Sequence, residues 1–238
     1  MAPSAMDEAL PARGQWQASI RSMLRGVTGV AAALALLAGC ATTAPSPPAA
    51  TAGGAGAAAA APGAMRSTPP AAARSGAVAL VNPGFESPMP AHRSDPEGWF
   101  TFQHAGDKSY SFALDATDPH GGARSLRIDY IGPEPYGAVA QPFEVGAHAG
   151  KLARYTAWMR TRDVGGPGAG LTLLLLSKGA VVSQNFMDDK LVTGTTGWTR
   201  YTLTLPIPQG AGRIEVGAML QGKGSLWLDD AVLEIVDP

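Results

Sequence analysis

From Val78 to the C-terminus, the sequence repeats short runs of strand-forming residues separated by turn-forming ones. The runs are rich in Val, Ile, Leu, Thr and Tyr, and Gly, Pro, Asp and Asn stand between them at intervals of about ten residues. The expected strands are 79–81, 99–104, 109–115, 125–131, 138–145, 152–162, 170–177, 181–186, 199–206, 213–220 and 225–236. This spacing predicts an all-β domain, an antiparallel β-sandwich or barrel.

Alternation of apolar and polar residues assigns faces within several of these runs. In 152–162, Tyr155, Ala157 and Met159 share one face, which we expect to face the core. The run 171–176 does not alternate, which predicts a strand that is buried on both faces or covered by a loop. In 225–236, alternation places Asp229 on the core-facing side together with Ala231, and a carboxylate there needs a hydrogen-bonding, ionic or metal partner.

Cys40 is the only cysteine of the chain and ends the sequence Leu-Ala-Gly-Cys at 37–40. Arg21 and Arg25 precede an apolar stretch at 27–38. Basic residues, a short apolar region and small residues at its end are typical of a secretory signal peptide. The stretch is shorter than the roughly 20 apolar residues of a membrane-spanning helix. The residues at 37–40 resemble a bacterial lipobox, which implies acylation of Cys40 with palmitate-type chains. The alternative is a buried or free thiol.

The chain therefore divides into a lipoprotein signal peptide at 1–39, a lipidated cysteine with a disordered linker at 40–77, and a folded domain at 78–238. Residues 41–77 are almost all Ala, Pro, Gly, Thr and Ser, and such a segment buries too little apolar surface to order. The net charge is −1 and the sequence has no basic stripe, so we expect no nucleic-acid partner. We expect a monomer that is lipid-anchored in the bacterial cell envelope. Ala41 and Thr42 resemble the residues that direct lipoproteins to the outer membrane.

Four motifs in the domain carry a family resemblance. They are Asn-Pro-Gly-Phe-Glu at 82–86, Gly-Gly-Ala-Arg-Ser-Leu at 121–126, Gly-Trp at 197–198 and Asp-Asp at 229–230. In this order they resemble the galactose-binding-like jelly rolls of the carbohydrate-binding-module superfamily. The segments 158–164, 185–189 and 194–198 are similar to the jelly-roll modules appended to some bacterial peptidases, esterases and AraC-type regulators. The resemblance implies an antiparallel jelly-roll β-sandwich.

The same resemblance implies a structural calcium ion. It places Glu86 and Asp229 as carboxylate ligands, with backbone oxygens near Gly122 and Ser125. Calcium takes six to eight oxygen ligands, more than this set supplies. The alternative is that Asp229 fastens a loop by hydrogen bonds without a metal.

We expect a non-catalytic module, because the sequence has no Gly-x-Ser-x-Gly, His-Glu-x-x-His or Gly-rich phosphate-loop motif. The resemblance implies a glycan or polysaccharide ligand in the envelope, bound by aromatic stacking beside planar polar groups. The candidate ligand-binding residues are Trp158, Arg160, Arg154, Gln184, Phe186 and Tyr136. The alternative is a structural envelope lipoprotein that binds a protein partner and no sugar. An exposed Trp158 in a groove favours the sugar, and a Trp158 buried under a loop with an apolar patch elsewhere favours the protein partner.

Overall fold

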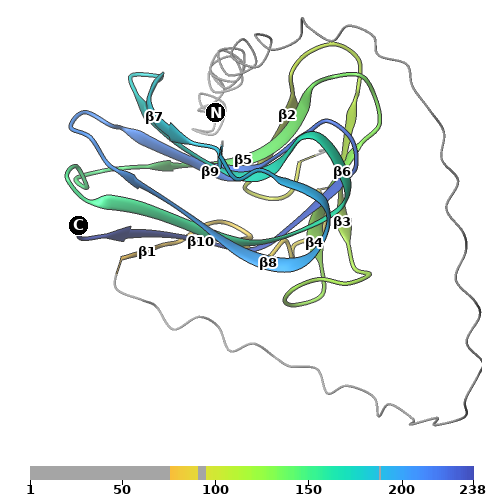
Figure 1. The fold of residues 1–238 in the computed structure, drawn as a ribbon. Coiled ribbons are helices and arrows are strands. Elements are labelled where there is room, and N and C mark those ends of the chain that lie inside the picture. The colour runs from red at the N-terminus through yellow and green to blue at the C-terminus, as the bar shows by residue number, and fades with distance from the viewer. Residues whose placement is uncertain (1–75, 91–94, 188) are drawn as a thin grey trace, which may run out of the picture.

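The computed structural model describes residues 76–90, 95–187 and 189–238, and every regular element in them is a β-strand (Figure 1). The strands are β1 (Ala77–Val78), β2 (Phe100–Gln103), β3 (Tyr110–Asp115), β4 (Ser125–Tyr130), β5 (Tyr136–Glu144), β6 (Leu152–Ser177), β7 (Ala180–Asn185), β8 (Val192–Pro206), β9 (Arg213–Gln221) and β10 (Ser225–Val236). All their pairings are antiparallel. The predicted all-β antiparallel fold is confirmed.

The 26-residue strand β6 belongs to both layers of the molecule. Its first half pairs with β10 and β8, and its second half pairs with β9 and β7. One layer, which we call the lower layer, thus has the order β3-β4-β10-β6-β8, and the upper layer has the order β2-β5-β9-β6-β7. Figure 1 shows the two layers facing one another, with β6 passing between them. This is a β-sandwich of the jelly-roll type.

β6 changes layer at a segment that extended L-residues do not favour. Asp163 has a φ of 52°, Gly166 of 80° and Gly168 of 126°. A side chain at Gly168 would also place its Cβ 2.9 Å from the Cβ of Leu191. Glycine adopts positive φ without a steric penalty, so these residues let the strand bend there. Between this bend and Met159 the pairing with β8 shifts register. The sequence analysis predicted two strands, 152–162 and 170–177, because the residues between them are typical of a turn, whereas the structure shows a bend within one strand.

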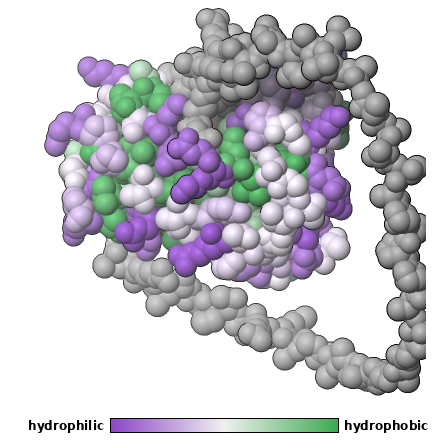
Figure 2. Space-filling model, in the orientation of Figure 1, coloured by the Kyte–Doolittle hydropathy of each residue, from purple (hydrophilic) through white to green (hydrophobic). Residues whose placement is uncertain are grey.

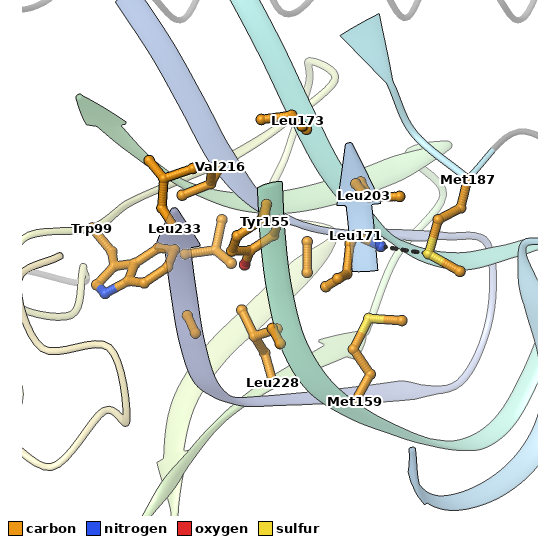
Figure 3. Close-up of a cluster of buried hydrophobic side chains, with 14 of the residues drawn as sticks. Trp99, Tyr155, Met159, Leu171, Leu173, Met187, Leu203, Val216, Leu228 and Leu233 are labelled. Atoms are coloured by element: carbon orange, nitrogen blue, oxygen red, sulfur yellow. Dashed lines mark hydrogen bonds between the residues drawn. The ribbon is translucent and has the colours of Figure 1, made fainter. Parts of the chain in front are cut away.

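The main core lies between the layers (Figure 3). Tyr155 and Met159 of β6 and Leu228 of β10 come from the lower layer, and Leu173 and Val216 from the upper layer, and all five are fully buried. The face predicted from the alternation of 152–162 is therefore confirmed. A two-layer sandwich buries apolar side chains chiefly between its sheets, where they contribute about 25 cal/mol for each Å² removed from water.

A second apolar cluster lies on the opposite face of the upper layer. It contains Phe102, Tyr136, Ala138, Ala140, Leu174, Leu176, Phe186 and Met219. Leu174 and Leu176 belong to it, whereas Leu173 and Leu175 belong to the main core, and all are buried. The run 171–176 is thus buried on both faces, as its lack of alternation predicted.

Large apolar side chains that stay exposed in the described residues do not gather in a patch. Val81, Ile131 and Val182 are each about half exposed, and they lie before β2, after β4 and in β7. Figure 2 shows hydrophobic and hydrophilic residues intermixed over the described surface in that view. Scattered apolar residues of this kind are normal for a protein surface.

The N-terminal predictions have two different outcomes. The first strand is Ala77–Val78 and not the predicted 79–81, because the chain leaves β10 there and enters a turn at 81–84. The signal peptide, Cys40 and residues 41–75 of the linker predicted at 40–77 lie outside the described residues, and Ala77, its last residue, is already part of β1.

None of the described segments forms a helix with the length and apolarity that crossing a membrane requires.

Candidate functional site

The outer face of the lower layer carries a tryptophan surrounded by arginines. In β10, Leu226 and Leu228 point into the core, so Trp227 between them points outward. Its direct cross-strand neighbours are Arg127 of β4 and Arg160 of β6. The guanidinium carbons of Arg160, Arg127 and Arg162 lie 4.2, 5.1 and 5.2 Å from the centre of the indole ring. These distances are those of cation–π contacts. We call Arg127, Trp227, Arg160 and Arg162 the Trp–Arg row.

Carboxylates hold Trp227, Arg127 and Arg160 of the Trp–Arg row in place. Asp115 accepts a hydrogen bond from Nε1 of Trp227 at 2.7 Å. Asp129 accepts from Nε of Arg127 at 2.9 Å and forms an ion pair with its second guanidinium nitrogen at 2.8 Å. Asp118 pairs with Arg160 at 2.6 Å. Charge-assisted hydrogen bonds of this kind fix both partners, so the row is a preorganised surface.

The Asp115 carboxyl shows the electrostatics of this face. Its partial burial raises its pKa, but the hydrogen bonds from Trp227 and Thr117 and the charge of Arg127 outweigh that effect. Together they lower the pKa of Asp115 to about 2. The carboxylate is therefore charged at any physiological pH.

Beside the row lies a hollow of about 300 Å³. Trp227, Arg160 and Arg162 form one side of it, and Trp198 of β8 forms another. Trp198 is half-buried and donates from Nε1 to the carbonyl oxygen of Asp118 at 3.0 Å. Guanidinium groups and carboxylates thus meet the half-buried indole of Trp198 around one small concave surface, whereas Trp227, which is 3% exposed, lies beneath its arginines. Such a set can stack on a ring and hydrogen-bond to its hydroxyl groups.

The 116–124 loop, between β3 and β4, supplies Asp118 to this hollow and is fastened from beneath by Asp229. One carboxylate oxygen of Asp229 accepts from the backbone N–H groups of His120 and Gly121 at 2.9 and 3.1 Å. The other accepts from the N–H of Asp230 at 2.8 Å. Burial raises the pKa of Asp229 to about 7, and the Asp230 charge adds to this, against the lowering effect of the three N–H donors.

Asp229 is buried, as predicted, but the prediction that it faces the core is wrong. Asp229 is fully buried, but it lies on the same side of β10 as Trp227, beneath the loop and away from the core. Asp230 has a φ of 46°, and the register between β10 and β6 shifts between Asp229 and Val232. This bulge resets the alternation, so Ala231 faces the core although Asp229 does not.

The 116–124 loop also covers Trp158. The imidazole of His120 stacks on the indole of Trp158 with ring centres 3.8 Å apart and an angle of 18° between their planes. Nδ1 of His120 lies 2.6 Å from Oδ2 of Asp230, which orients the ring. Trp158 is half-buried and does not line the hollow. A loop residue therefore already occupies the stacking position of Trp158, which is the arrangement expected for a protein partner, whereas the exposed apolar patch expected with it is not found among the described residues.

The predicted calcium residues meet at the same loop, but through N–H groups. The Glu86 carboxylate accepts from the N–H of Ala123 at 2.9 and 3.0 Å and from that of Arg124 at 3.2 Å. A Cβ at Gly122 would lie 2.1 Å from one oxygen of Glu86, so the loop backbone lies directly against this carboxylate. Ser125 begins β4 and is fully buried.

Donor N–H groups do not suit a cation, which needs oxygen ligands. Among residues 76–90, 95–187 and 189–238, no group of three or more His, Cys, Asp or Glu side chains is placed to hold a metal ion. The described arrangement around Glu86 and Asp229 matches the alternative expectation, a loop fastened by hydrogen bonds. Calcium binding stays a prediction, which chelation tests.

The predicted ligand-binding residues divide between the two layers. Arg154, Trp158 and Arg160 lie on the outer face of the lower layer, and only Arg160 reaches the hollow. Tyr136 and Phe186 are fully buried in the second apolar cluster of the upper layer. Gln184 of β7 lines a separate hollow of about 440 Å³ beside Tyr201 of β8. These six residues therefore do not form one site.

Sequence reasoning missed Trp198, Trp227, Arg127 and Arg162 as site residues. The signal was present, because Arg127 stands between the core residues Leu126 and Ile128, just as Trp227 stands between Leu226 and Leu228. Trp198 belongs to the Gly-Trp motif at 197–198, and Trp227 stands two residues before the Asp-Asp motif at 229–230, but neither tryptophan was assigned to the ligand. The contribution of the 116–124 loop carried no signal in the sequence.

Comparisons with known proteins support the fold more than any function. No family model matches the chain. It is 28% identical over 181 residues to the uncharacterized HTH-type transcriptional regulator YbfP of Bacillus subtilis (strain 168), a match that covers 73% of this chain. The chain spans 58% of the length of that relative.

Among solved structures, an arabinose-bound α-L-arabinofuranosidase, MgGH51, matches 67% of this chain and 26% of its own, with a TM-score of 0.51 and 15% identity. The CBM22-1 xylan-binding domain of Paenibacillus barcinonensis Xyn10C matches 65% of this chain and 92% of its own, with a TM-score of 0.44 and 13% identity. A cyclase from Fischerella sp. TAU gives 0.47 and 12% over 68% of this chain and 98% of its own. At these identities the arabinofuranosidase match supports the sandwich fold, and function has to be argued from the site.

Proposed function

We propose that this chain is a non-catalytic glycan-binding lipoprotein of the bacterial envelope, and that the Trp–Arg row with Trp198 forms its binding surface. One observation carries the proposal. Two indoles, three guanidiniums and two carboxylates line one hollow on an outer sheet face, and most of them are fixed by hydrogen bonds or ion pairs. Aromatic faces beside planar polar groups are the chemistry that binds a sugar ring with its hydroxyls.

The charge balance of the row favours a ligand rich in hydroxyl groups. Arg127 pairs with Asp129 of its own strand, and Arg160 pairs with Asp118 of the 116–124 loop. Each pair offers N–H donors and carboxylate acceptors side by side, and a sugar hydroxyl uses both. A preorganised array of this kind loses little side-chain entropy when it binds.

The environment of His120 is consistent with a module without catalysis. Its ring pairs with Asp230 and stacks on Trp158. Within the described residues, the His120 ring forms no hydrogen bond to a Ser, Thr or Cys side chain. A nucleophile activated by a general base requires such a contact.

The anchor is a proposal from the sequence. Acylated Cys40 would hold the domain at a membrane surface, and the Ala/Pro/Gly-rich segment after it would act as a tether. The absence of Asp after Cys40 favours the outer membrane.

A binding screen with matched variants of one strand tests the proposed site. The mature chain without its lipid, residues 41–238, is screened against an array of envelope and plant glycans. Trp198→Ala removes part of the lining of the hollow, whereas Arg200→Ala changes an exposed residue of the same strand that does not line it. We expect Trp198→Ala to abolish binding and Arg200→Ala to retain it. If the folded wild-type protein binds no glycan, the proposal is wrong and a protein partner becomes the better explanation.

A further inference from the structure

Arg162 differs from the other two arginines of the Trp–Arg row. Arg127 pairs with Asp129 and Arg160 pairs with Asp118. Arg162 is exposed and forms no ion pair with any carboxylate in the described residues. Its guanidinium instead makes a cation–π contact with the Trp227 ring, whose centre lies 5.2 Å away. Within the Trp–Arg row, Arg162 is thus the guanidinium without a carboxylate partner among the described residues.

The carboxylates near Arg162 are already engaged. Asp129 lies on the same row of the sheet, since both it and Arg162 are register partners of Ser225. It accepts from Arg127 and from Oγ of Ser225 at 2.6 Å. Asp163, the next residue along the chain, accepts from Oγ1 of Thr195 at 3.2 Å. Both carboxylates are thus engaged with other donors, which leaves the Arg162 guanidinium as the one in the hollow that can pair with an incoming anion.

The position of Arg162 matches the geometry of a carboxylated sugar. Arg162 and Trp198 both line the hollow, together with the hydroxyl-bearing Thr195 and Thr196. A pyranose ring can place its C–H face on the indole of Trp198 and its carboxylate against the planar guanidinium, which binds carboxylates through two parallel hydrogen bonds. The hollow is at the small end of the 300–1,000 Å³ that ligand sites span, which suits a short glycan segment.

We infer that the ligand of the Trp–Arg row is a uronic-acid-containing glycan, whose carboxylate is bound by Arg162. This inference rests on the proposed glycan-binding function and specifies its substrate class. Arg162 acts here as a specificity-determining residue. Trp198 supplies stacking energy that does not depend on whether the sugar carries a carboxylate.

The test compares acidic polymers with the same polymers after their charge has been removed. Polygalacturonate and alginate are each measured by titration calorimetry against the mature chain, beside their methyl-esterified forms, which keep the sugar rings and lose the carboxylates. Arg162→Gln removes the charge from the hollow. Arg154→Gln is the matched control, because Arg154 lies on the same strand and the same face and does not line the hollow.

We expect the wild-type protein to bind at least one acidic polymer about tenfold or more tighter than its ester, as charge-assisted bidentate bonds imply. Arg162→Gln should remove this preference and Arg154→Gln should keep it. Equal affinity for acid and ester overturns the inference, as does equal binding of dextran sulfate, which would indicate unspecific attraction of anions. If neutral glycans bind through Trp198 without an acid preference, the proposed function stands and the inference fails. If nothing binds, both fail.

Discussion

Substitution of Asp229 by alanine tests how the site is held together. Asp229 is fully buried and accepts hydrogen bonds from three backbone N–H groups, those of His120, Gly121 and Asp230. Leaving a buried donor without an acceptor costs about 1–3 kcal/mol. Two of these donors belong to the 116–124 loop, where water can replace the carboxylate, so each cost falls near the lower end. We expect the free energy of unfolding to fall by about 3 kcal/mol at pH 7.

Equilibrium unfolding in urea, followed by tryptophan fluorescence, measures this loss. The m-value should stay unchanged, because the surface exposed on unfolding is nearly the same. Asp237→Ala is the matched control. Asp237 is 84% exposed and pairs with Lys151, and loss of an exposed ion pair changes stability by less than about 1 kcal/mol. A loss below about 0.5 kcal/mol for Asp229→Ala would refute the claim that this carboxylate fastens the loop.

The pH dependence of the same pair of proteins supplies a second measurement. The pKa of Asp229 is raised from 3.8 to about 7 in the folded state, so the folded protein holds a proton that the unfolded chain releases. Stability from this group is therefore full below about pH 4, declines as the pH rises toward 7 and is constant above. Each pKa unit corresponds to 1.36 kcal/mol. The difference between wild type and Asp229→Ala should be larger at pH 5.5 than at pH 8, by about 2 kcal/mol, and an equal difference would contradict the raised pKa.

Three further predictions concern the fold, the metal and the anchor. A Cβ at Gly217 would lie 1.9 Å from the carbonyl oxygen of Val139, so Gly217→Ala should abolish soluble folded protein as judged by circular dichroism, whereas Gly197→Ala, with open space around it, should change stability by less than about 0.5 kcal/mol. EDTA tests the predicted calcium: a drop in the thermal midpoint that calcium reverses would establish the metal, whereas an unchanged midpoint would indicate that the N–H donors around Glu86 and Asp229 fasten the loop without it. Cys40→Ser should eliminate the acyl mass in intact-protein mass spectrometry, and an unchanged mass and membrane fraction would count against the lipobox.

The fold could be predicted because its pattern is local. Period-two alternation in runs such as 152–162 identifies which residues face the core, and the non-alternating run 171–176 identifies a strand covered on both sides. The bend of β6 could not be predicted with the same rule. A change of layer within one strand depends on where β9 and β10 pair with it. These pairings are long-range and cannot be inferred from the residues at 163–168.

The site was only partly predictable for a related reason. Arg160 and Trp158 were identified from one strand, but their neighbours on the sheet depend on strand order. Trp227 and Arg127 become neighbours of Arg160 because β10 lies between β4 and β6. Tyr136 and Phe186 were grouped with Trp158 by residue type, although they belong to the other layer. A single bulge at Asp230 was enough to reverse the expected face of Asp229.

The binding surface and the buried carboxylate are physically connected. The strands place Arg127 and Arg160 beside Trp227, since both are its register partners in the lower layer. The other contributions come from the 116–124 loop, whose Asp118 pairs with Arg160 and accepts from Trp198. That loop is held by the carboxylate of Asp229, which contacts neither the row nor the hollow. The burial of the Asp229 carboxylate costs free energy, but it places the carboxylate where it fixes the loop that completes the site.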